Sequence, residues 1–172
     1  YRELLVRWFQ FGAFCPVFRL HGNRLNGEPS QDESKASTGG PNEVWSYGEE
    51  AYEILKQYLF LREDMKPYIE RTMKDVADNG APVMSPLFYY FPKDAQAAAI
   101  EDQYMFGADV LVAPVMQLGQ RKRPVYLPEG ASWIEASSGK EYQGGRTIDA
   151  DAPLSVIPVF VRKGSGLNIT LK

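Results

Sequence analysis

Two polar side chains near the start of the chain, Arg19 and His21, lie within a short and mostly apolar run, residues 17–22. This run, with sequence VFRLHG, has the length and the terminating glycine that are typical of a short buried strand. His21 is the only histidine in the chain, and an imidazole can both donate and accept a hydrogen bond near neutral pH. It could therefore hold a polar ligand at the end of the strand. A core histidine bonded to backbone would leave the same pattern.

The segments on either side must position this strand end. Residues 2–14 place apolar side chains at helical spacing, which predicts a helix that Pro16 ends. Residues 23–42 are polar and lack hydrophobic periodicity, which predicts a loop near the site; both a lid and an inert insertion remain open. Residues 45–79 carry a helical apolar stripe that Pro67 should kink or split in two.

After residue 80 the pattern changes from helices to strands. The apolar run 82–92 is bounded by prolines and predicts one strand. Trp133, Tyr142 and Phe160 should anchor the core of an all-β part that begins near residue 110. Its expected strands, separated by glycine-containing turns, are 110–113, 124–127, 132–135, 146–149 and 157–161.

Composition excludes several classes of protein. The chain has 172 residues, a net charge of −3 and a pI near 5.3, which give no electrostatic reason to bind nucleic acid or an anionic membrane. No run of about 18 apolar residues occurs, so no membrane-spanning segment is expected. Cys15 is the only cysteine, which excludes an intrachain disulfide and, together with the single histidine, argues against a zinc site. No cofactor or metal is implied.

Several segments resemble glycoside hydrolase family 31, the retaining α-glycosidases that include α-glucosidases and α-xylosidases. The resemblance lies in residues 7–16 (RWFQFGAFCP), 18–22 (FRLHG), 45–68 and 102–115, in the family's order. It implies an α/β plus all-β fold class: residues 1–107 would be the C-terminal part of a (β/α)8 barrel, and residues 108–172 the proximal C-terminal β-sandwich. The run 82–92 would be the eighth barrel strand.

The same resemblance implies a role for His21, because the family's histidine at this position binds the sugar in the −1 subsite. Arg19 would orient the end of the strand. A retaining glycosidase needs two carboxyl groups about 5 Å apart, and the resemblance places both on aspartates of earlier barrel strands. No catalytic residue is therefore assigned within the chain, and the chain alone is expected to be inactive. Glu49 and Glu50 are adjacent at a helix start, where carboxylates serve the helix dipole.

Substrate and partners follow from the same comparison of motifs. Gly22 after His21 is more similar to α-xylosidases than to α-glucosidases, which favours hydrolysis of terminal α-xylosides in oligosaccharides or polysaccharides. The alternatives are an α-glucosidase of the same family and a non-catalytic carbohydrate-binding module, which the β-rich second half allows. Part of a barrel leaves strand edges exposed, so the chain should need the remainder of the barrel or self-association.

Overall fold

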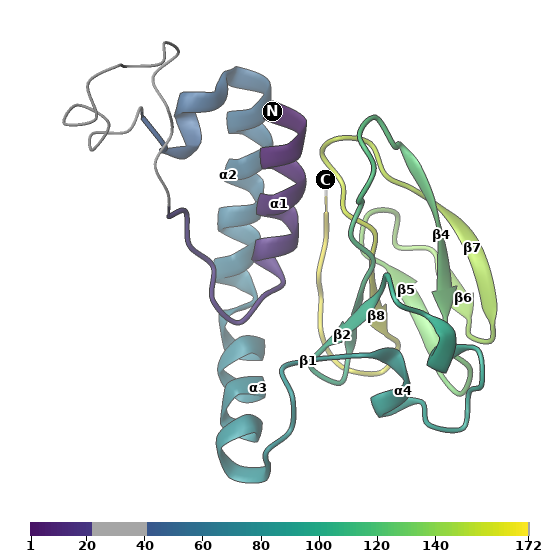
Figure 1. Cartoon of the computed structure of the whole chain (residues 1–172). Coiled ribbons are helices and arrows are strands. Elements are labelled where there is room, and N and C mark those ends of the chain that lie inside the picture. The colour runs from purple at the N-terminus through teal and green to yellow at the C-terminus, as the bar shows by residue number, and fades with distance from the viewer. Residues whose placement is uncertain (22–40, 172) are drawn as a thin grey trace, which may run out of the picture.

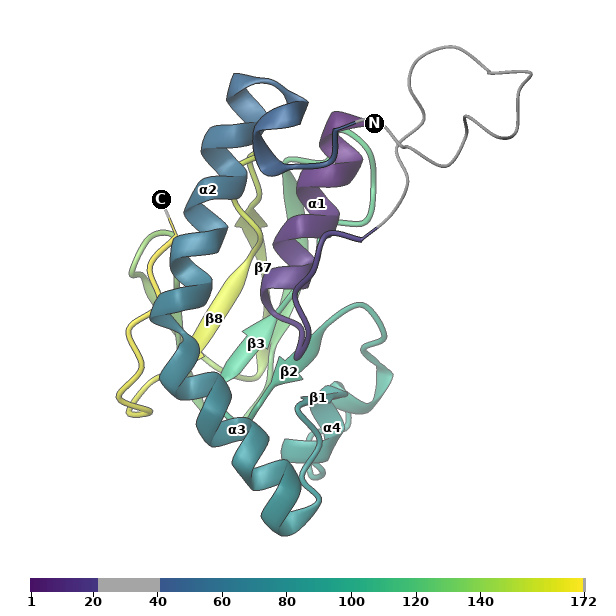
Figure 2. The same ribbon diagram turned by 90° about the vertical axis from the view of Figure 1, so that its left-hand side faces the viewer.

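The computed structural model describes residues 1–21 and 41–171. Three helices, α1 (Arg2–Ala13), α2 (Glu49–Asp64) and α3 (Lys66–Asn79), lie on one side of an antiparallel β-structure (Figure 1). α1 and α2 run side by side, and α3 continues beyond the end of α1 (Figure 2). The length and hydropathy needed to span a membrane are met by none of the helices in these described residues.

The helix predicted at residues 2–14 is confirmed as α1. Its buried side chains include Val6, Phe9 and Ala13, whose spacing forms one apolar face. The amide of Cys15 still donates a hydrogen bond to the carbonyl of Gly12 at 3.1 Å, and Pro16, which lacks an N–H, follows directly. The chain therefore leaves the helix at residues 14–16.

The helical stripe at residues 45–79 is interrupted as predicted. A short 3-10 helix, η2 (Val44–Tyr47), comes first, and α2 and α3 meet at Met65. Pro67 stands in the first turn of α3, where its missing N–H costs nothing, but it cannot donate the hydrogen bond to the carbonyl of Glu63 that would continue α2. Gly80 ends α3 in the left-handed conformation, with φ of 68°.

Residues 17–21 do not form the strand that the apolar run predicted. They adopt no regular secondary structure, and Val17 is 77% exposed. The reason is that a strand exists only through hydrogen bonds to a neighbour, and no strand among the described residues pairs with this segment. The loop predicted at 23–42 lies outside the described residues except for its last two positions.

The single strand predicted at residues 82–92 is also wrong in extent. Only β1 (Met84–Ser85) is strand, and a one-turn helix, α4 (Leu87–Tyr90), follows at once. Pro86 sits between them with extended backbone at the helix N-cap, and proline can neither donate to a sheet nor extend it there. A 3-10 helix, η3 (Ala97–Ala99), comes next.

The carboxylate of Asp94 binds backbone amides at the start of η3 and also holds a distant turn. One carboxylate oxygen accepts hydrogen bonds from the amides of Gln96 and Ala97, at 3.0 and 3.2 Å. The other accepts from the Tyr126 hydroxyl at 2.7 Å and the Glu129 amide at 2.8 Å. Burial is the largest single effect and raises the pKa of Asp94, but the four hydrogen bonds together outweigh it, so the pKa lies below its ordinary value.

The β-structure is antiparallel in every pair of strands. Six strands form one sheet in the order β1-β2-β3-β8-β5-β6, and β4 pairs with β7 in a second, two-stranded sheet. All five strands predicted after residue 110 are present; the three-residue strands β2 and β6 were not predicted. The remaining bounds are β2 Tyr104–Phe106, β3 Val110–Val112, β4 Lys122–Leu127, β5 Ser132–Glu135, β6 Glu141–Gln143, β7 Arg146–Asp151 and β8 Val159–Arg162.

The six-stranded sheet is buried on both faces, because its central strands alternate between two cores. Val110 and Val112 of β3 pack with the helices, whereas Leu111 between them packs with the second sheet. Trp133 and Phe160 are fully buried in the second core and Tyr142 packs against it, which confirms the predicted anchors.

Candidate functional site

Arg19 and His21 lie beyond the end of α1, in the irregular segment 17–21, and both side chains are exposed. Within the described parts of the chain, neither side chain makes an ion pair or a hydrogen bond. His21 is therefore not packed in the core of this chain. Its position and that of Arg19 depend on how the preceding residues are held.

Arg62 of α2 holds the residues where the chain leaves α1. One terminal nitrogen of its guanidinium donates hydrogen bonds to the carbonyls of Ala13 and Cys15, at 2.8 and 2.6 Å. The other donates to the carbonyl of Pro16 at 2.8 Å. The guanidinium carbon also lies 5.9 Å from the centre of the Phe18 ring. Burial among these neutral groups lowers the pKa of Arg62, and an arginine remains charged despite such a shift.

Phe18 fixes the next step of the chain toward His21. Its ring meets that of Phe9 edge to face, with centres 4.6 Å apart. A Cβ at Gly12 would lie 3.1 Å from the Phe18 ring, so the glycine leaves the space that this ring uses. The β-structure also holds this part of the chain: the Tyr104 hydroxyl of β2 donates a hydrogen bond to the carbonyl of Phe14 at 3.0 Å. Four successive carbonyls, 13 to 16, are thus each held by a side chain.

A second group of polar contacts joins the helices to the β-structure; we call it the helix–sandwich interface. It consists of Arg7 and Gln10 of α1, Tyr58 of α2 and the backbone of residues 152–157. All of these side chains are buried, and their partners on the sandwich side are backbone groups. The distances are Arg7 to Val156 O and Ala152 O, 2.8 Å each; Gln10 to Leu154 O, 2.7 Å; Tyr58 to Ser155 O, 2.8 Å; and the Ile157 amide to the Tyr58 hydroxyl, 3.2 Å.

Four acidic residues of the described chain, Glu49, Glu50, Asp102 and Asp109, have surroundings typical of structural roles. Glu49 and Glu50 are exposed in the first turn of α2, as expected from the helix dipole. Asp102 pairs with Arg123, and Asp109 with Arg71, at 2.7 and 3.6 Å. Among residues 1–21 and 41–171, no three His, Cys, Asp or Glu side chains lie close enough to hold a metal ion.

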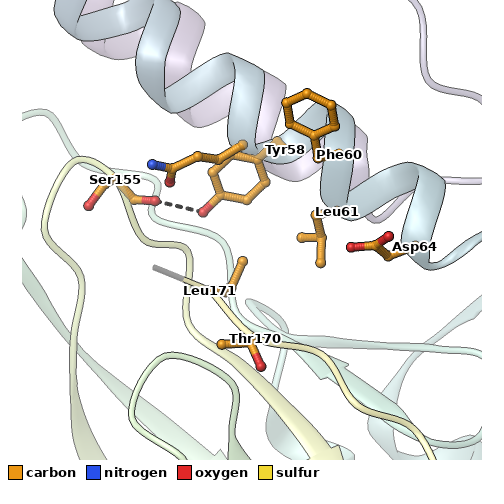
Figure 3. A pocket seen from close by; sticks show the side chains of 8 residues that line it. Tyr58, Phe60, Leu61, Asp64, Ser155, Thr170 and Leu171 are labelled. Carbon is orange, nitrogen blue, oxygen red and sulfur yellow. Dashed lines mark hydrogen bonds between the residues drawn. The ribbon is translucent and has the colours of Figure 1, made fainter.

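A hollow of about 320 Å³ lies between α2 and the C-terminal segment (Figure 3). Leu61 and Asp64 line it from the helix, and Thr170 and Leu171 line it from the opposite side. Neither Arg19 nor His21 contributes to this hollow. It is therefore separate from the predicted sugar site.

Comparison with known proteins assigns both halves of the chain to one class of enzymes, the glycoside hydrolases. Residues 1–72, which contain α1 and α2, match the model of the glycosyl hydrolases family 31 TIM-barrel domain. Residues 80–167, which contain every strand, match the glycosyl hydrolase family 31 C-terminal domain. The chain belongs to glycosyl hydrolase family 31: it contains a C-terminal part of the barrel and the β-sandwich domain that follows.

Individual relatives agree with this assignment. The crystal structure of a family 31 α-xylosidase from a soil metagenome, complexed with xylose, superposes with a TM-score of 0.90 and 53% identity, over 96% of this chain and 25% of that one. "Alpha-glucosidase 2" of Bacillus thermoamyloliquefaciens is 34% identical over 96% of this chain and 19% of its own length. "Alpha-xylosidase" of Saccharolobus solfataricus is 34% identical over 97% of this chain and 21% of its own length. The chain thus spans about a fifth to a quarter of these relatives.

The sequence predicts His21 and Arg19 as site residues through their motif, but it did not point to the contacts that Arg62 makes with the preceding residues. In the sequence, Arg62 is one basic residue in the last turn of an amphipathic helix, a place where arginine is common. Its contacts with residues 13–16 are 46 to 49 positions away in sequence. One feature of the sequence did point to such a residue: the last carbonyls of any helix, here α1, need hydrogen-bond donors from elsewhere.

Proposed function

We propose that this chain is part of a retaining α-glycosidase that removes terminal α-linked sugars, and that its preferred substrates are α-xylosides. The observation that carries the proposal is the likeness to the metagenomic α-xylosidase, at 53% identity with a TM-score of 0.90. The residue after His21 supports the same choice, because Gly22 resembles the α-xylosidase form of the motif. An α-glucosidase of the same family is the second candidate, supported by the relative from Bacillus thermoamyloliquefaciens.

In this proposal His21 forms a hydrogen bond with a hydroxyl of the sugar in the −1 subsite, and Arg19 orients the segment that carries it. The hydrogen bond strengthens as positive charge develops at the anomeric carbon, which favours the transition state. The nucleophile and the general acid/base are aspartates on barrel strands that precede residue 1, so the chain alone is inactive. We place the boundary between the barrel part and the sandwich at residues 107/108.

The partners in this proposal are an oligosaccharide substrate and either the remainder of the barrel or a second copy of the chain. A non-catalytic carbohydrate-binding module is a weaker alternative, because residues 1–72 match a catalytic barrel domain. Two aspartate-bearing strand motifs in the sequence upstream of Tyr1 would support the enzyme.

The test is turnover by the full-length protein that carries this chain, assayed with aryl α-xylosides and aryl α-glucosides. We expect a higher kcat/KM for the xylosides. The His21→Ala variant should lose roughly ten- to a hundredfold in kcat/KM, the worth of a hydrogen bond of about 1.5–3 kcal/mol made in the transition state. Unchanged kinetics in a folded His21→Ala variant would remove His21 from the site, and faster turnover of glucosides would favour the second candidate.

A further inference from the structure

We infer that Arg62 is the positioning residue for His21, an inference that rests on the proposed function. Arg62 donates to three carbonyls at and just after the end of α1, those of residues 13, 15 and 16, and its guanidinium carbon lies over the Phe18 ring. These contacts end three residues before His21. Arg62 does not contact the sugar; it acts through the backbone that carries His21.

Among the described residues, His21 has few contacts of its own to hold it. The backbone of residues 17–21 makes no hydrogen bond with any other described residue, and the segment is not part of a sheet. Within the described chain, the contacts that direct the backbone toward His21 are therefore those upstream, at residues 13–16 and the Phe18 ring. Of those anchoring contacts, Tyr104 supplies one hydrogen bond and Arg62 supplies three.

The geometry of these contacts needs an arginine. Three carbonyls are reached from two nitrogens of one planar group, and the carbon of the same group lies over the Phe18 ring, 5.9 Å from its centre. A lysine has one nitrogen and no flat face, so it can keep the charge but only some of these contacts. Methionine fills much of the same space and supplies no donor.

Replacing Arg62 should change the position of His21 without removing any contact with the sugar. A shift of about 1 Å in a group that stabilises the transition state can cost up to about a hundredfold in rate. An interaction made mainly in the transition state lowers kcat and kcat/KM together and leaves KM nearly unchanged. Arg62→Met should therefore lower kcat by about tenfold or more, with Arg62→Lys between it and the parent.

The experiment is a double-mutant cycle in the full-length protein, assayed with aryl α-xylosides. If Arg62 acts through His21, Arg62→Met adds little further loss of kcat in a His21→Ala background. Arg71→Met is the matched control. Like Arg62, Arg71 lies over an aromatic ring, here Tyr68 at 5.2 Å, and it pairs with Asp109; but it lies on α3 and holds no carbonyl of residues 13–16. It should leave kcat unchanged.

The outcomes separate the two proposals. Losses from Arg62→Met and His21→Ala that multiply independently, or a folded Arg62→Met variant with unchanged kcat, would overturn the role of Arg62 and leave the proposed function standing. If Arg62→Met does not fold, Arg62→Lys and Tyr104→Phe take its place in the same cycle. No turnover of any aryl α-glycoside by the parent would overturn the proposed function and this role with it.

Discussion

Replacing Arg7 by methionine removes a buried cation whose hydrogen bonds all go to neutral groups. Its guanidinium donates to the carbonyls of Val156 and Ala152 at 2.8 Å, to that of Gln120 at 3.2 Å and to the side-chain oxygen of Gln10 at 3.0 Å. Burial is the largest influence on Arg7 and lowers its pKa. Among the described residues, the hydrogen-bond partners of Arg7 include no carboxylate.

The expected cost follows from the acceptors that methionine leaves behind. Each buried acceptor without a donor costs about 1–3 kcal/mol, and three buried acceptors lose theirs: the carbonyls of Val156 and Ala152 and the side-chain oxygen of Gln10. The carbonyl of Gln120 keeps a hydrogen bond from Arg121. Some of this is recovered because the guanidinium no longer has to be taken out of water. We therefore expect Arg7→Met to lower the free energy of unfolding by about 3–5 kcal/mol, measured by urea titration of the full-length protein.

Arg121→Met is the matched comparison, because Arg121 also connects the β-structure to α1. It pairs with Glu3 at 2.5 Å, but its side chain is 45% exposed. Exposed ion pairs contribute little to stability and weaken with salt, so the expected effect is small. The Arg7 contribution should persist at about 0.5 M NaCl, since its partners carry no charge. An Arg121→Met loss as large as that of Arg7→Met would refute this reasoning.

Two further predictions concern stability. Gly144→Ala would place a Cβ 1.9 Å from the backbone oxygen of Pro128, whereas Gly145→Ala meets no atom closer than 3.6 Å and suffers only from its φ of +77°. We expect losses of about 3 kcal/mol or more for Gly144→Ala against about 1–2 kcal/mol for Gly145→Ala in urea titrations; equal losses would contradict the packing argument. For Asp94, whose folded pKa is lowered, the stability difference between the parent and Asp94→Asn should be constant above about pH 5 and shrink as pH falls below about 4 through the folded pKa. If the difference in stability between parent and Asp94→Asn were unchanged at pH 2, the stabilisation could not come from an ionised carboxylate at Asp94.

Local patterns in the sequence were enough to predict the helices and most strands. The apolar spacing of residues 2–14, the break at Pro67 and the stop at Gly80 act within one turn of chain, so they do not depend on distant partners. Strands such as β3 are buried on both faces, so their sequence is a continuous apolar run that predicts a strand. These features are confirmed in the structure.

The failures have a common physical origin in long-range pairing. Residues 17–21 and 82–92 have the composition of strands, but a strand forms only against a neighbour, and the described chain offers one only to Met84–Ser85. Within the candidate site, His21 carries a motif that a sequence can reveal. Arg62 carries none, because its role arises from carbonyls that only the packing of α2 on α1 brings within reach.

The helix–sandwich interface described above has a consequence for how the two sides can change over evolution. On the helix side, recognition depends on three specific side chains, Arg7, Gln10 and Tyr58. On the sandwich side it depends on main-chain carbonyls and one amide, which every residue type except proline at the amide provides equally. Half-buried positions such as Leu154 and Ser155 can therefore exchange side chains without breaking these bonds, while the helices cannot. A sandwich of quite different sequence could dock on the same helices, provided that its loop follows the same backbone path.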